Sequence, residues 1–161
     1  MRSQRTVAAI MVVCFLALWV EAPPAGAQEP GACEVEITTP KPGDQVGASG
    51  RVRGTARIPD GTHLWVLAHM KDLVAEWWPQ GGRAAVVEPN GEWVIITGYG
   101  LARDIGEDFE VATVVVDANT HQRLLNWVNR AKETGEYPPM EFPTPVDECV
   151  PVKVVVKKIS H

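Results

Sequence analysis

Short runs of β-branched and aromatic residues recur about every ten positions along this chain, and turn-forming residues separate them, as is typical of an all-β sandwich. One run, His63–Met70, is apolar at almost every position, which predicts a central strand covered on both faces. The dipeptide Asn90-Gly91 predicts the turn of a hairpin within Arg83–Gly100. We expect the other strands in Cys33–Pro40, Gly50–Pro59, Leu73–Trp78, Asp108–Asp117 and Cys149–Ile159. The predicted fold class is therefore all-β, a sandwich of about seven strands.

One segment departs from this pattern and predicts a helical insertion before the last strand. Three apolar residues recur at helical spacing within residues 119–135. They are Leu124, Val128 and Ala131. Asn119 and Gln122 resemble a capping box, and Gly135 occupies the place of a C-terminal cap. The proline-rich segment 137–148 then leads to the last strand, and connections of this length are often functional in compact domains.

Residues 1–27 predict a cleaved secretory signal peptide. Arg2 and Arg5 supply positive charge, Val7–Val20 is an uncharged apolar run, and Ala25–Ala27 provides small residues for cleavage. The alternative is a membrane anchor, but the apolar run is shorter than the roughly 20 residues that a helix needs to span a bilayer. We therefore expect residues 28–161 to form a single exported domain, periplasmic or secreted, with no membrane insertion after cleavage.

Cys33 and Cys149 remain after the predicted cleavage. An even pair of cysteines in an oxidising compartment predicts a disulfide bond. Such a bond would close a loop over most of the chain and stabilise the fold by about 4–5 kcal/mol. The alternative is a pair of free or metal-bound thiols.

The charge of the chain argues against two classes of partner. The formal net charge is −5, and the basic residues are scattered. Lys153, Lys157, Lys158 and Arg130 are too few and too far apart to form a basic patch. The chain therefore has no electrostatic reason to bind nucleic acid or anionic lipid.

The order of these segments resembles the bacterial immunoglobulin-like domains of secreted proteins. The stretches that carry the resemblance are ITTPKPGDQV with GRVRGTAR, then LWVL, PNGEW and GEDFEVATVVV. The resemblance implies that Trp65 is the buried tryptophan of the third strand and that Phe109 takes the place of the corner tyrosine. It also implies that the first strand runs parallel beside the last, which would bring Cys33 and Cys149 together. The chain departs from antibody-type domains because it lacks their inter-sheet cysteine pair and because a phenylalanine cannot make the corner hydroxyl bond.

Two adjacent tryptophans, Trp77 and Trp78, are the first candidates for a ligand site. Neighbours on a strand point to opposite faces, so we assign Trp77 to the core and Trp78 to a partly exposed position. Trp78, with Trp127 or Tyr137 as a second aromatic residue, could stack on a sugar ring. The alternative is that the helix covers Trp78, with Trp127 packed against it.

Metal binding and catalysis find less support in the sequence. His63 and His69 share a strand face but lie about 20 Å apart, so they cannot bind one ion, although His121 could approach one of them. The acidic loop around Asp104 lacks the order of a calcium-binding EF-hand, and Ser49 lies outside a nucleophile motif. We expect no metal and no cofactor.

Three classes of function remain open. The resemblance favours a non-catalytic module for protein interaction or structural support. A carbohydrate-binding module built on Trp78 is the second candidate, and a small secreted hydrolase is the third. The expected partner is a protein or a carbohydrate of unknown identity.

Overall fold

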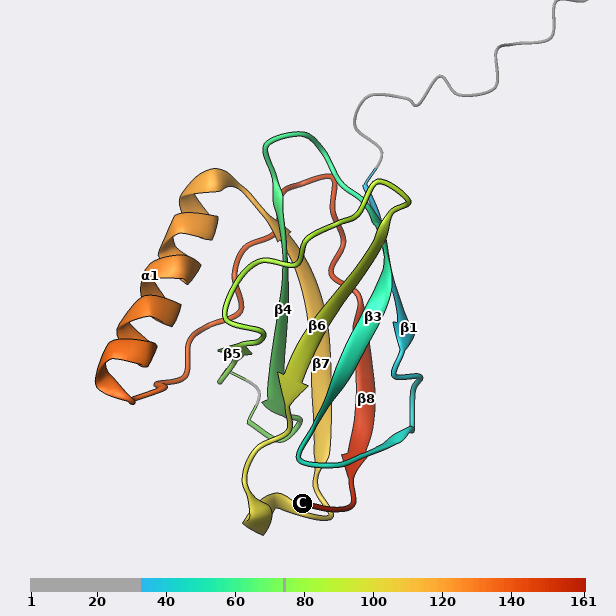
Figure 1. Cartoon of the computed structure of the whole chain (residues 1–161), viewed down its shortest axis with the longest axis vertical. Coiled ribbons are helices and arrows are strands. Elements are labelled where there is room, and N and C mark those ends of the chain that lie inside the picture. Colours follow the sequence, from blue (N-terminus) through green and yellow to red (C-terminus); the bar gives the residue numbers. More distant parts are fainter. Residues whose placement is uncertain (1–32, 74) are drawn as a thin grey trace, which may run out of the picture.

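The computed structural model of this chain describes residues 33–73 and 75–161, so the predicted signal peptide lies outside the described residues. Two β-sheets and one long helix make up the described fold (Figure 1). The smaller sheet, here called sheet A, has the order β1 (Glu34–Thr39), β3 (Ser49–Arg57), β6 (Glu92–Gly98). The larger sheet, sheet B, has the order β2 (Gln45–Val46), β8 (Lys153–Lys158), β7 (Asp108–Val116), β4 (His63–Met70), β5 (Trp78–Pro79). This mostly β, two-sheet architecture agrees with the predicted β-sandwich.

Sheet A is buried on one face only. Along β3 and β6 every second side chain is buried, and the residues between them are exposed. The inward side chains, among them Val52, Trp93 and Ile95, meet inward side chains of sheet B in the core between the sheets. Gly54 is required there because a Cβ atom would overlap the carbonyl oxygen of Glu36 and lie 2.6 Å from the Trp93 ring.

Sheet B is buried on both faces at its central strands, β4 and β7. The six inner residues of β4 and the last six residues of β7 are all buried, as predicted for the strand at His63–Met70. Alternate side chains face sheet A, and the others form a second core beneath the helix α1 (Ala118–Thr134) and the segment that follows it. Trp65 belongs to this second core. Trp65 is thus fully buried, as the resemblance implied, and Trp93 fills the core between the sheets.

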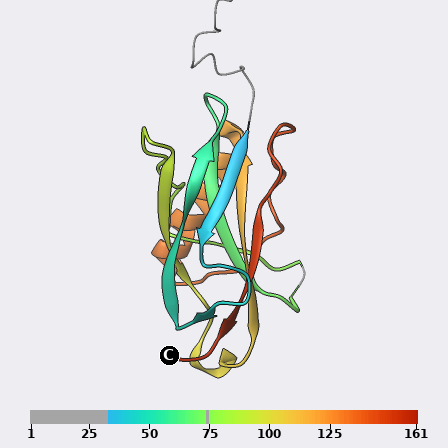
Figure 2. The ribbon, with the colours of Figure 1, turned by 90° about the vertical axis from the view of Figure 1, so that its right-hand side faces the viewer.

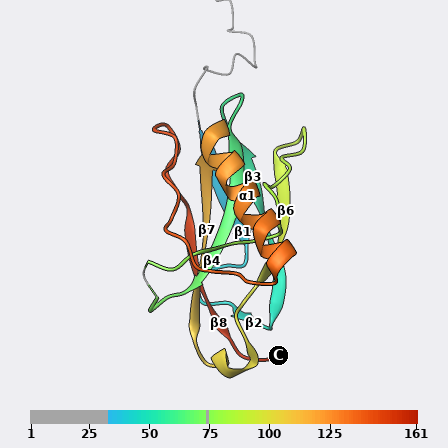
Figure 3. The ribbon, with the colours of Figure 1, turned by 90° about the vertical axis from the view of Figure 1, so that its left-hand side faces the viewer.

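The helix α1 covers sheet B through the predicted residues. Leu124, Val128 and Ala131 are buried, and Gly135 ends the helix in a left-handed conformation with φ of 74°. The predicted N-terminal cap is wrong by two residues, because Asp117 caps the helix by accepting a hydrogen bond of 2.7 Å from the Thr120 N–H. That hydrogen bond lowers the pKa of Asp117. Figure 3 shows α1 in front of the strands on the side opposite β1 and β8.

The predicted disulfide is present and joins the two sheets. Cys33 precedes β1 of sheet A, Cys149 precedes β8 of sheet B, and their Cα atoms are 5.2 Å apart. The expected parallel pairing of first and last strands is wrong in detail, because β1 pairs antiparallel with β3 and the two-residue β2 makes the parallel contact with β8. Figure 2 shows β1 (blue) and β8 (red) on the side of the molecule that faces the viewer. The disulfide joins the residues that precede these two strands.

Two other predicted strands differ from the structure. Among the described residues of Leu73–Trp78, Trp78 alone belongs to a strand, since the chain turns after β4 and rejoins sheet B at β5. In the predicted hairpin the Asn90-Gly91 turn forms, but residues 83–87 leave sheet A, and Ala85 forms an isolated bridge with Leu64 of β4. No helix in the described residues is long and apolar enough to cross a membrane.

Candidate ligand-binding cleft

Trp78, Trp127 and Tyr137 line a single cleft of about 680 Å³, here called the aromatic cleft. They come from β5, from α1 and from the proline-rich return between α1 and β8 (residues 135–152). In Figure 1, β5 lies between α1 and β4, so these distant segments meet at one flank of sheet B. The other wall comes from the loop after β6, including Leu101, Arg103 and Asp104. The fold thus brings together all three aromatic residues that the sequence suggested.

Trp78 is half-buried and fixed at both its side chain and its main chain. Its indole Nε1 donates a hydrogen bond of 2.8 Å to the Tyr137 carbonyl. The Gln80 side chain accepts from the Gly98 N–H at 2.9 Å and donates to the Trp78 carbonyl at 2.9 Å. These bonds tie β5 to the return and to the end of β6. The indole N–H is occupied, so Trp78 can offer a ligand only the part of its ring that remains exposed.

Trp127 holds the next residue of the same return. Its Nε1 donates to the Pro138 carbonyl at 3.2 Å, and its ring lies 6.1 Å from the Tyr137 ring in an edge-to-face arrangement. The Tyr137 side chain remains 58 % exposed. The two tryptophans thus bind the carbonyls of neighbouring residues, and both border the aromatic cleft.

The loop after β6, which forms the polar wall of the aromatic cleft, is held in place by hydrogen bonds. Asp104 accepts a hydrogen bond of 2.6 Å from the Leu101 N–H and lies 3.7 Å from the exposed Arg103 guanidinium. The ammonium of Lys158, which is fully buried, donates to the Leu101 carbonyl. Leu101 itself is 58 % exposed at the rim. A buried cation thereby fixes the loop that presents one apolar and two charged side chains to the cleft.

Trp77 belongs to the core, as the alternation of strand side chains predicted. It is 3 % exposed and stacks on the His69 ring at 3.7 Å. The His69 Nδ1 donates to the Leu73 carbonyl at 3.0 Å, and its Nε2 lies 3.4 Å from Glu110. Lys153 completes this group by bonding Glu110 at 2.8 Å and lying over the Trp77 ring. The histidine is 4 % exposed and lies at the base of the aromatic cleft, among the residues that line it.

Two further histidines form a stacked pair at the start of α1. The rings of His63 and His121 are 3.6 Å apart and nearly parallel, and Trp65 Nε1 donates to His121 Nδ1 at 3.1 Å. The lone pair of an imidazole nitrogen lies in the plane of its ring. In two stacked rings these planes are parallel, so the two nitrogens do not converge on one ion. Burial, together with His63, lowers the pKa of His121. The pair is therefore a packing contact between β4 and α1.

Three of the acidic residues near the end of sheet B have a local partner. Asp104 caps the Leu101 turn, Asp108 pairs with Lys157 at 3.0 Å and Glu110 pairs with Lys153. No group of three or more histidine, cysteine or acidic residues within 33–73 and 75–161 is arranged to hold a metal ion.

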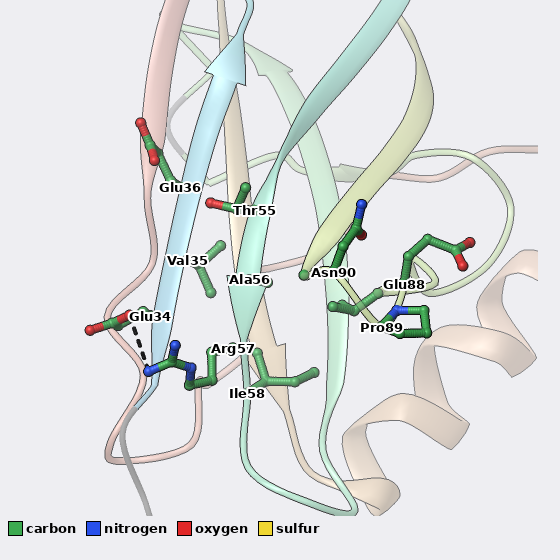
Figure 4. A pocket seen from close by; sticks show the side chains of 12 residues that line it. Glu34, Val35, Glu36, Thr55, Ala56, Arg57, Ile58, Glu88, Pro89 and Asn90 are labelled. Atoms are coloured by element: carbon green, nitrogen blue, oxygen red, sulfur yellow. Dashed lines mark ion pairs between the residues drawn. The ribbon is translucent and has the colours of Figure 1, made fainter. Parts of the chain in front are cut away.

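Two further hollows lie on sheet A. Figure 4 shows the first, of about 650 Å³, between the start of β1, the end of β3 and the turn before β6, with the Glu34–Arg57 ion pair at its rim. That pair is 3.8 Å long and largely exposed, so it contributes little and orients no ligand. The second, of about 810 Å³, is here called the sheet A groove. It runs along the open face of β3 and β6.

Sequence reasoning did not identify the polar wall of the aromatic cleft. Gln80, Leu101 and Arg103 meet the tryptophans only because β5 and β6 end at the same side of the molecule. The WWPQGG stretch placed Gln80 near Trp78, but nothing in the sequence linked either residue to the loop after β6. No known protein family matches this chain, and no curated protein matches it significantly.

Proposed function

We propose that this chain is a non-catalytic, exported binding module with an immunoglobulin-like β-sandwich, and that its aromatic cleft binds a carbohydrate. The strand orders support the immunoglobulin-like part. If β1, β3, β4, β5, β6, β7 and β8 are taken as strands A, B, C, C′, E, F and G, the sheets become ABE and GFCC′ with strand D missing. The disulfide, typical of oxidising compartments, supports export.

The convergence of Trp78, Trp127 and Tyr137 on one cleft carries the carbohydrate proposal. Sugars present C–H surfaces that pack on aromatic rings, and hydroxyl groups that hydrogen-bond to side chains at the rim of a site. Here the two tryptophan side chains are fixed by hydrogen bonds to main-chain carbonyls, and Arg103 and Asp104 line the same cleft. A preformed site of this kind loses little conformational entropy when it binds a ligand.

Titration of the protein with soluble polysaccharides tests this proposal through tryptophan fluorescence. We expect Tyr137→Ala, which removes an exposed ring without breaking a side-chain hydrogen bond, to weaken binding about tenfold. Val86→Ala on sheet A is the matched control and should bind as the parent protein does. Absence of saturable binding across neutral, acidic and amino-sugar polymers would contradict the proposal, as would full binding by Tyr137→Ala.

A role in protein interaction is the second candidate, and the sheet A groove favours it. Val86, Val94 and Ile96 are each about half exposed there, on a face that no other element in the described residues covers. A photo-crosslinking side chain at Ile96 should capture a partner in the producing cell, whereas the same group at the exposed Asn126 of α1 should not. Equal capture at both positions would argue against a specific interface. No feature of the described residues favours the hydrolase.

A further inference from the structure

The free edge of β6 can be located from its hydrogen bonds. The Ala56 N–H donates to the Gly91 carbonyl and the Tyr99 N–H donates to the Ala48 carbonyl, each at 2.8 Å. The constant antiparallel register then directs the main-chain groups of the odd-numbered residues of β6 toward β3. Those of Glu92, Val94, Ile96 and Gly98 point away from sheet A.

Both ends of this edge are already occupied. The Glu92 carbonyl accepts a hydrogen bond of 2.9 Å from the Glu88 N–H. At the other end, the Gly98 N–H donates to the Gln80 side chain at 2.9 Å. Between them, no hydrogen bond from residues 33–73 or 75–161 reaches the outward N–H and carbonyl groups of Val94 and Ile96. The edge therefore has an open notch with two donors and two acceptors.

Two other sheet edges, those at β5 and β1, are better protected. Beside β5, Trp77 and Met140 exchange two main-chain hydrogen bonds, so the return covers that edge. β1 carries the exposed carboxylates of Glu34 and Glu36 and is interrupted by a bulge before Thr39. Charges and bulges are common means of blocking edge pairing. The notch in β6 instead presents Val94 and Ile96, which are 50 % and 54 % exposed.

The charge beside the notch indicates the chemistry of its partner. Arg51 and Arg53 lie opposite Ile96 and Val94 on the outer face of β3, and Arg83 lines the same groove. All three are exposed, and none has an ion-pair partner among the described residues. The groove is also lined by Glu88 and Glu92, so its three arginines leave a small local excess of positive charge. On a chain of net charge −5 this excess favours an acidic ligand.

We propose that an acidic, extended peptide segment of a partner protein adds to β6 as a fourth strand of sheet A. The inference deepens the interaction role proposed above and rests on it. Main-chain bonds to Val94 and Ile96 would give affinity, and carboxylates facing Arg51, Arg53 and Arg83 would give selectivity. A second copy of this chain fits poorly, because the Glu88 and Gln80 caps that flank its own β6 would meet those of the first copy.

Fluorescence polarisation with a short labelled peptide of alternating valine and glutamate tests the inference. We expect saturable binding, weakened about tenfold or more when lysine replaces glutamate or when alternate peptide nitrogens are methylated. Val94→Pro should weaken binding about as much, because it removes an outward donor without breaking a bond to β3. Tyr137→Ala in the aromatic cleft is the matched control and should bind normally.

Three outcomes would overturn the inference. One is no saturation up to about 1 mM peptide, where weak strand addition should still be measurable. Another is equal binding by folded Val94→Pro, with folding checked by circular dichroism. The third is self-association of the parent protein that Val94→Pro abolishes, which would identify a second copy as the occupant. Capture of a partner from Ile96 that the acidic peptide does not displace would retain the interaction role but reject this peptide class.

Discussion

Sheets A and B are built from similar antiparallel ladders but differ in how many of their faces are covered. In β3 exposed and buried side chains alternate, whereas β4 and β7 have long runs in which every side chain is buried. The difference follows from α1 and the return, which lie on the outer face of sheet B and leave that of sheet A open. The alternation of buried and exposed side chains along a strand thus indicates whether one or both faces of its sheet are covered. Each of the two candidate binding surfaces is associated with one of these cases. The aromatic cleft lies where the cover of sheet B ends, and the sheet A groove lies where there is no cover.

The covalent tie between the sheets gives the largest expected effect. Replacing Cys33 and Cys149 with alanine removes a crosslink between residues 116 positions apart. Loop-closure entropy predicts that this lowers the free energy of unfolding by about 4–5 kcal/mol. Urea denaturation followed by circular dichroism measures the loss. The unmodified protein in reductant should match the double variant. A loss below about 1 kcal/mol would mean that the two layers hold together without the bridge.

Truncation of a buried side chain of α1, where the helix packs on sheet B, should have the second-largest effect. Leu124 of α1 is fully buried against this sheet, so Leu124→Ala should cost about 3 kcal/mol of unfolding free energy. Leu125, the next residue, is only partly buried and provides the matched control, with an expected cost of about 1 kcal/mol. Urea denaturation of both variants tests this difference. Equal losses would show that α1 does not depend on its buried face for docking.

The same substitution on the two outer faces compares the sheets directly. Val114 on β7 is 1 % exposed under α1, and Val94 on β6 is 50 % exposed on open sheet A. Val114→Ala should cost about 2 kcal/mol, since removal of two buried methyl groups leaves a cavity. Val94→Ala should stay within about 0.5 kcal/mol of the parent protein. Thermal and urea denaturation measure both values. A comparable loss at Val94 would mean that another part of the molecule covers sheet A in solution.

Local sequence patterns predicted much of this fold because burial along a strand or a helix depends on residues that are close in sequence. The apolar run His63–Met70 identified a doubly covered strand to the residue, and the spacing of Leu124, Val128 and Ala131 identified the buried face of α1. The disulfide between Cys33 and Cys149 followed from compartment and cysteine count. In each case the feature depends on residues that are close in sequence or on an even pair of one residue type.

The features that the sequence did not predict depend on contacts between segments that are far apart in the chain. Trp65 was predicted to be buried, and it is, but strand alternation does not say whether it faces sheet A or the helix. Residues 83–87 looked like a hairpin arm, but the chain crosses toward β4, where Ala85 pairs with Leu64. The aromatic candidates Trp78, Trp127 and Tyr137 were found by residue type, whereas Arg103 and Asp104 needed the tertiary fold. A sequence pattern can locate apolar surfaces, but it cannot place loops from distant strands side by side.

The smallest expected effect concerns pH and the start of α1. Burial and the neighbouring His63 lower the pKa of His121 from its ordinary value of 6.5. The unfolded chain therefore binds more protons than the folded protein below that pH. Neutral His121 stabilises the fold fully above pH 6.5, and this contribution is lost as the pH falls through the folded-state pKa. The same protonation would leave the buried Trp65 N–H without its acceptor on His121 Nδ1.

His121→Asn tests this contact because an amide oxygen can replace Nδ1 as the acceptor but does not titrate. The unfolding free energy of the parent protein should decrease more between pH 7.5 and 5 than that of the variant, by less than the loss from Val114→Ala. His161→Asn, at the exposed end of the chain, should follow the parent protein. His121 of α1 contacts the buried indole of Trp65 on the outer face of sheet B. A decrease in pH should therefore weaken the packing of α1 on sheet B and leave sheet A unchanged. Identical pH profiles for His121→Asn and the parent protein would mean that the stacked pair accommodates the proton without displacing α1.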